Sequence, residues 1–113
     1  MTEITRSRIG VNTYLAPQGS LADSLTLKSL QQEVEQCIAG SEIQLIIDLN
    51  NVPTLNSRVL ELLMDWQELL IPKGGSLTIV KVNPVNLDVL TIAELSNYIH
   101  IVTHNETSTS QRA

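Results

Sequence analysis

The sequence has few aromatic and few basic residues. Its aromatic residues are Tyr14, Trp66 and Tyr98, and it has no phenylalanine. This leaves no stacking platform for single-stranded nucleic acid, which stacks its bases on aromatic side chains. The chain has seven Lys and Arg against twelve Asp and Glu, a formal charge of −5. Because binding to phosphate backbones depends on clustered Lys and Arg, no nucleic-acid partner is expected.

Cysteine and long apolar runs are also scarce. The single cysteine, Cys37, excludes an internal disulfide. An unpaired cysteine in a chain without a charged-then-apolar leader indicates a reducing compartment, so we expect a cytoplasmic protein. The longest apolar runs, such as residues 45–47, are far shorter than the about 20 residues that cross a bilayer. No membrane insertion is expected.

The length of 113 residues fits a single domain. At this size, folding buries roughly two-thirds of the surface of the unfolded chain, so the core needs no metal, cofactor or disulfide. We expect the domain to span residues 1–102. Residues 103–113 are polar apart from Ala113 and are expected to form a disordered C-terminal tail.

The apolar pattern predicts strands that alternate with helices. The expected strands are residues 4–8, 11–18, 43–49, 76–82 and 99–102. The expected helices are residues 24–40 and 57–71, with a third that opens at Pro84. This order predicts a single α/β domain with a mixed, mostly parallel sheet and helices packed against it. The continuous apolar run of the central strand, residues 43–49, is typical of a strand covered on both faces.

Capping residues mark the ends of the first two helices. Asp23 or Ser24 is expected to cap the start of the first helix, and Asn56 or Ser57 the start of the second, because short polar side chains accept hydrogen bonds from free N–H groups there. Gly40 suits a left-handed cap at the end of the first helix.

Residues with catalytic or metal-binding chemistry are scattered. His100 and His104 lie four residues apart with only Glu106 close by, and a surface or tail position explains them better than a metal site. Asp48 ends the central strand, where ligands often bind in open α/β sheets, but alone it is interpreted as a turn-capping carboxylate. Cys37 has no base within sequence range and is interpreted as a small apolar residue. The sequence therefore predicts a protein that is not an enzyme.

The second helix has an unusually wide apolar surface. Its charged residues fall on one narrow arc of the helical wheel: Arg58, Glu61, Asp65 and Glu68. The opposite, core-facing arc holds Val59, Leu62, Leu63, Trp66, Leu69 and Leu70. Leu60, Met64 and Ile71 form a second apolar stripe on the flank beside Ser57. Either a neighbouring helix covers this stripe, or the stripe is a docking patch for a partner.

The order of the motifs resembles the STAS domain of bacterial anti-sigma factor antagonists over about residues 10–102. The motifs that carry the resemblance are Gly19-Ser20-Leu21, the strand Leu45-Ile46-Ile47-Asp48-Leu49, the loop Asn51-Val52-Pro53-Thr54-Leu55, the helix start Asn56-Ser57, the turn Gly74-Gly75, the strand Leu77-Thr78-Ile79-Val80 and the helix start Asn83-Pro84. Their order and spacing, rather than any single motif, are specific.

This resemblance implies a partner-switching function. The chain would bind a serine kinase that also acts as an anti-sigma factor, phosphorylation of Ser57 would release it, and a serine phosphatase would restore binding. The implied partner-binding residues are Asp23, Asn56, Ser57, Arg58, Leu60, Glu61 and Met64. The chain is expected to be a monomer or a weak homodimer.

The sequence departs from the family pattern next to Ser57. The pattern there is Asp-Ser-x-Gly followed by Leu, whereas this chain has Asn56-Ser57-Arg58-Val59-Leu60. Asn56 removes a charge, and Val59 places a branched side chain where the partner backbone is expected to approach. The alternative function is therefore a constitutive STAS subunit of a stress-signalling or lipid-transport assembly, in which Ser57 is never phosphorylated.

Overall fold

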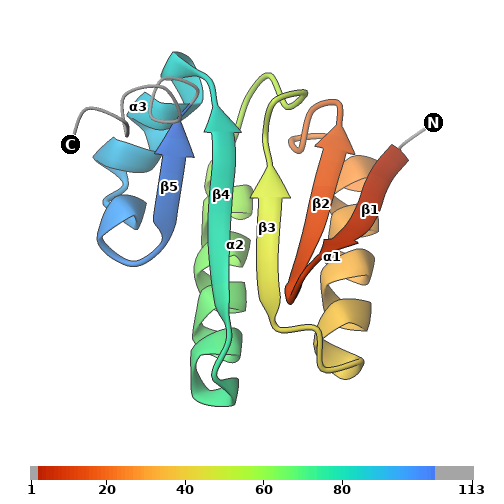
Figure 1. Cartoon of the computed structure of the whole chain (residues 1–113). Helices are drawn as coiled ribbons and strands as arrows, with labels where there is room; N and C mark the ends of the chain where they lie inside the picture. Colours follow the sequence, from red (N-terminus) through yellow and green to blue (C-terminus); the bar gives the residue numbers. More distant parts are fainter. Residues whose placement is uncertain (1–2, 104–113) are drawn as a thin grey trace.

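The strands pair side by side in chain order and form one mixed sheet (Figure 1). The computed structural model describes residues 3–103. The strands are β1 (Glu3–Ile9), β2 (Asn12–Gln18), β3 (Gln44–Asp48), β4 (Ser76–Val82) and β5 (His100–Thr103). The helices are α1 (Ser24–Ala39), α2 (Ser57–Leu70) and α3 (Pro84–Ile92), with short 3-10 turns η1 (Ile71–Lys73) and η2 (Leu95–Asn97). The expected tail lies outside the described residues, except that its first residue, Thr103, belongs to β5.

The sheet has an antiparallel start and a parallel body, as the sequence predicts. β1 and β2 form an antiparallel hairpin, and β2 to β5 are parallel neighbours. Parallel neighbours are joined by right-handed crossovers, and four strands laid down in one direction place the connecting helices on one face. In Figure 1, α1 and α2 lie behind the sheet, and α3 lies at its upper end beside β5. None of the helices in residues 3–103 lies on the near face.

The expectation that the central strand is covered on both faces was therefore wrong. In β3, Leu45 and Ile47 point into the helix layer and are buried, whereas Ile46 is half-buried on the opposite face. The apolar run did not distinguish these two environments, because a half-buried isoleucine is still favourable on a pleated surface.

The core is aliphatic, as expected from the lack of phenylalanine. Its fully buried large side chains are Leu15, Leu21, Leu30, Leu45, Ile47, Leu49, Leu63, Leu70, Leu77, Ile79, Leu90 and Ile99. Trp66 is also buried in this core, as is Cys37, whose pKa is raised by burial. Both residues have the packing role that the sequence predicts.

Each helix begins with a polar cap. Asp23 accepts a hydrogen bond from the N–H of Leu25, and Asn83 accepts one from the N–H of Asn86. The expected left-handed cap at Gly40 was wrong: Gly40 has φ of −91°, and the following Ser41 takes the positive φ of 65°. The N–H of Gly40 instead closes the last turn of the helix.

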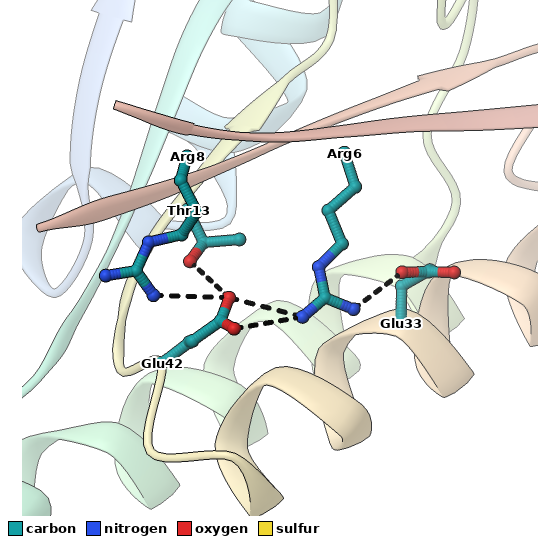
Figure 2. Close-up of polar contacts among 5 residues, drawn as sticks. All are labelled: Arg6, Arg8, Thr13, Glu33 and Glu42. Atoms are coloured by element: carbon teal, nitrogen blue, oxygen red, sulfur yellow. Dashed lines mark hydrogen bonds and ion pairs between the residues drawn. The ribbon is translucent and has the colours of Figure 1, made fainter. Parts of the chain in front are cut away.

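An ionic cluster connects the edge strand β1 to the helix layer (Figure 2). Arg6 of β1 pairs with Glu33 of α1 at 3.3 Å and with Glu42, in the loop before β3, at 3.2 Å. Glu42 also accepts a hydrogen bond from the hydroxyl of Thr13 at 2.8 Å and pairs with Arg8 at 3.4 Å. The bond from Thr13, followed by the pairing with Arg6, lowers the pKa of Glu42. Arg6 and Arg8 thus connect the edge strand to α1 and to the loop before β3.

Candidate functional site

The loops that precede the three helices meet at the C-terminal edge of the parallel strands. The N–H of Gly19, before α1, donates to the carbonyl of Asn51, before α2, at 3.0 Å. The side-chain amide of Asn86, in the first turn of α3, donates to the carbonyl of Val52 at 2.9 Å. These bonds bring the starts of α1, near Asp23, and α2, at Ser57, to the same edge of the sheet. The two residues are 34 positions apart in the sequence. This edge is the usual location of binding sites in open α/β sheets.

Ser57 is the first residue of α2 and is exposed. Asn56 is the cap, and its side chain accepts a hydrogen bond from the N–H of Val59 at 3.0 Å. Helix starts have N–H groups without partners inside the helix, and this cap engages one of them. The N–H groups of Ser57 and Arg58, which are not bonded within the helix, therefore remain able to bind an anion.

Val59 does not obstruct this surface. It is fully buried and points into the core, so the expectation that its branched side chain meets an approaching partner was wrong. On the exposed side, Arg58 and Glu61 form an ion pair at 3.7 Å along the helix. Such exposed pairs are worth little free energy, so both side chains are available to a partner.

The second apolar stripe of α2 is only partly covered. Leu60 and Met64 are half-buried and pack against the core, whereas Ile71, in η1, is exposed. Leu69, which the helical wheel placed in the core, is 53% exposed. Only part of the Leu60 and Met64 side chains is therefore open to solvent.

Gln67 explains why the buried arc of α2 is shifted away from Leu69. Its side chain is buried and bridges two backbone groups, accepting from the N–H of Leu77 at 2.8 Å and donating to the carbonyl of Tyr98 at 2.6 Å. Residue type alone did not indicate this role, because glutamine side chains are ordinarily solvent-exposed.

A polar pair missed by sequence analysis lies at the end of β3. The Tyr14 hydroxyl of β2 donates to the carboxylate of Asp48, which also accepts from the N–H of Asn50 at 2.7 Å. Burial and then this bond raise the pKa of Tyr14 to about 12. Lys81 lies 3.8 Å from the same carboxylate and has a positive φ of 59° at a bulge in β4. Asp48 is thus the turn-capping carboxylate that the sequence predicts, with an additional partner.

The predicted absence of a metal centre was examined in the described residues. Within residues 3–103, no group of three or more His, Cys, Asp or Glu side chains is placed to hold a metal ion. His100 is exposed on β5, and its suggested partner His104 lies outside the described residues. In the same part of the chain, every helix is too short or too polar to span a bilayer.

Comparisons with known proteins identify the family. A family model described as "Mlab, STAS domain" matches residues 10–103. An anti-sigma factor antagonist from Mycobacterium paratuberculosis has a TM-score of 0.80 at 22% identity, covering 100% of this chain and 96% of that chain. A putative anti-sigma factor antagonist from Thermotoga maritima has a TM-score of 0.78 at 16% identity, covering 97% and 95%.

The phosphorylated form of the Bacillus cell fate determinant SpoIIAA is also similar, with a TM-score of 0.70 at 13% identity, covering 96% of this chain and 98% of that chain. No curated protein sequence matches the chain. The structural similarities support the fold, and the family model covers most of the sequence. The chain therefore belongs to the STAS domain family, with the fold of the anti-sigma factor antagonists.

Proposed function

We propose that this protein is a cytoplasmic, non-enzymatic binding module of a partner-switching circuit. It binds a serine kinase that acts as an anti-sigma factor, phosphorylation of Ser57 releases it, and a serine phosphatase restores binding. The partner contacts the start of α2 together with the cap of α1. The proposed contact residues are Asp23, Asn56, Ser57, Arg58, Leu60, Glu61 and Met64.

The observation that carries this proposal is the position of Ser57. Its hydroxyl is exposed at the first residue of a helix, where a kinase can reach it without unfolding the domain. A phosphoserine carries about −1.5 to −2 charges at neutral pH. The free N–H groups and the helix dipole favour an anion at this end by roughly 0.3 to 1 kcal/mol. The free domain therefore tolerates the modification.

The bound domain does not tolerate it equally well. In the complex, the phosphate is desolvated beside the half-buried Leu60 and Met64 and near the carboxylate of Glu61. Unless the partner presents an arginine, this cost weakens binding, and each 1.4 kcal/mol corresponds to about tenfold in affinity. Phosphorylation thus changes affinity without changing the fold.

The test starts with affinity purification of the chain from its native cell and intact-mass analysis of the purified chain. We expect a population of molecules with one phosphate, which peptide mapping places on Ser57. The purified partner is then titrated with Ser57→Ala and Ser57→Asp. Ser57→Ala is expected to bind as the unmodified chain does, and Ser57→Asp roughly a hundredfold more weakly.

Ser7→Asp is the matched control. Ser7 is an exposed serine of β1 on the sheet face opposite the helices, so its substitution adds the same charge far from α2. It is expected to leave affinity unchanged. Equal affinities of the two Ser57 variants, with no phosphate on Ser57 in cells, would contradict the proposed switch.

The second candidate is a STAS subunit that stays bound to its assembly. The observation that favours it is the local sequence Asn56-Ser57-Arg58-Val59, which departs from the Asp-Ser-x-Gly pattern. In that case purification yields a stable complex in which the chain carries no phosphate, and the complex does not dissociate when ATP is added.

A further inference from the structure

Helix α3 carries apolar side chains on its outer side as well as on its inner side. Its inner side chains, Asn86 and Leu90, are fully buried. On the outer side, Val85 is 63% exposed and Ile92 is 82% exposed, with the half-buried Val89 between them. At 3.6 residues per turn these three residues fall within an arc of about 60°, and we call them the α3 stripe. Contiguous exposed apolar side chains on a protein surface mark a candidate binding site.

Within the described part of the chain, Val89 packs partly against the core, but Val85 and Ile92 at the two ends of the α3 stripe are left exposed. α3 lies at the upper end of the sheet beside β5, the last strand in the sheet order (Figure 1). Residues 104–113, which follow β5, contain Ala113 as their single apolar residue. This segment therefore lacks the apolar side chains that would bury two branched residues.

The charges around the α3 stripe are of one sign. Asp88 directly precedes Val89 in the chain and lies on the flank of the α3 stripe. Glu94 lies just beyond the end of the helix, and both carboxylates are exposed. The sequence has no Lys or Arg between Lys81 and Arg112. The surface of α3 is thus an apolar strip bordered by carboxylates. Its chemical complement is an apolar strip bordered by cations.

This charge pattern selects one kind of occupant. A second copy of the chain would place Asp88 and Glu94 near the same carboxylates of its partner, and like charges facing each other oppose association. An anionic lipid surface is disfavoured for the same reason. An amphipathic helix with Lys and Arg beside its apolar face matches both the apolar strip and the carboxylates that border it. Such helices bind apolar surfaces through residues spaced three and four apart.

We propose that the α3 stripe is a second docking surface, which binds a cationic amphipathic helix of a partner protein. This goes beyond the switch at Ser57 and holds whether or not Ser57 is phosphorylated. The surface is preformed, since the buried amide of Asn86 fixes α3 to the carbonyl of Val52 at 2.9 Å. Preformed surfaces bind more tightly because less conformational entropy is lost on association.

The experiment uses a synthetic amphipathic peptide of about 15 residues, long enough to form a helix, with a leucine face bordered by lysines. It is titrated into the isotope-labelled full-length chain and followed by amide chemical shifts. We expect the largest shifts on α3. The same peptide with glutamate in place of lysine is expected to bind at least tenfold more weakly.

Two variants and one control locate the binding. Ile92→Ser removes part of the α3 stripe, and Asp88→Asn removes one carboxylate; each is expected to lower the affinity severalfold or more. Leu25→Ser changes an equally exposed apolar residue, 69% exposed at the start of α1, and is expected to have no effect. Thermal melting of each variant confirms that the fold is intact.

Three outcomes would overturn the proposal: shifts that avoid α3, equal binding of the lysine and glutamate peptides, or an affinity unchanged by Ile92→Ser. Sedimentation of the chain alone also measures whether it forms a dimer. A dimer that Ile92→Ser dissociates would show that a second copy, and not a cationic helix, occupies the stripe. Because none of these measurements involves Ser57, their failure leaves the proposed switch untouched.

Discussion

At the scale of single residues, the pair of Tyr14 and Asp48 shows how the end of β3 is held. Asp48 is buried, and a buried carboxylate is stable only with hydrogen-bond partners. It accepts from the Tyr14 hydroxyl and from the N–H of Asn50. The second bond shapes the first residues of the loop that leads to Ser57. The pair therefore contributes both to stability and to the geometry of the candidate site.

Tyr14→Phe should lower the free energy of unfolding by about 1.5–3 kcal/mol, because a hydrogen bond to a charged group is lost. Tyr98→Phe is the control, since Tyr98 is 60% exposed, and no change is expected. Urea unfolding of both variants measures the difference. Equal stabilities of the two variants would mean that the bond to Asp48 contributes nothing.

The same pair makes stability depend on pH in the alkaline range. The pKa of Tyr14 is raised from 10.0 to about 12, so the folded chain keeps a proton that the unfolded chain loses. The resulting stabilisation is fully present below pH 10.0 and is lost as the pH rises through about 12. The stability difference between the wild type and Tyr14→Phe should therefore shrink across this window. A difference that stays constant with pH would contradict the assignment.

At the scale of elements, the turn between α2 and β4 depends on two glycines with different roles. Gly74 has a positive φ of 84°, which ends the 3-10 turn η1. Gly75 is required for a different reason: a Cβ at this position would lie 2.2 Å from the carbonyl oxygen of Ile43. The same carbonyl accepts the N–H of Ser76 at 2.9 Å, which starts the pairing of β3 with β4. The close approach therefore sets the register of the two central strands.

Gly75→Ala should lower the free energy of unfolding by about 3 kcal/mol, the upper end of the usual cost of overpacking, because the backbone of Ile43 must move. Gly10→Ala is the matched control. Gly10 has a positive φ of 63° but open space around it, so the cost should be only about 1 kcal/mol of backbone strain. Denaturant unfolding compares the two. Equal costs would show that the contact with Ile43 relaxes freely.

At the scale of the whole molecule, the described residues share one aliphatic core. The buried aliphatic side chains form one cluster that reaches from β2 to the turn before β5. The single cysteine is buried inside this cluster. The fold of the described residues thus rests on packing and on the connections between loops at one edge of the sheet.

Dialysis of the protein against chelator and reductant should leave its melting temperature unchanged, since the core is sufficient by itself. Loss of a bound ligand worth about 1 kcal/mol would lower the melting temperature by roughly 4–8 °C for a domain near this size. Thermal melting before and after dialysis measures this. A decrease of that size would reveal a structural metal or an intermolecular disulfide.

The sequence by itself determined which segments become strands and helices and where the helices begin. The starts of α2 at Asn56 and α3 at Asn83 were predicted because capping depends on residues that are neighbours in the chain. The sheet order followed from the alternation of elements, and the family followed from the order of motifs.

Only the tertiary structure decided which side chains are covered, because coverage depends on elements far apart in the sequence. It showed that Leu69 is exposed while Gln67 is buried, and that Val59 points inward beneath the proposed binding surface. It also paired Tyr14 with Asp48, which are 34 residues apart and adjacent only through the parallel pairing of β2 and β3. The exposed face of α3 is a further example. The helix start at Asn83-Pro84 predicts a helix, but the position of α3 beside the last strand of the sheet decides which of its sides remains exposed.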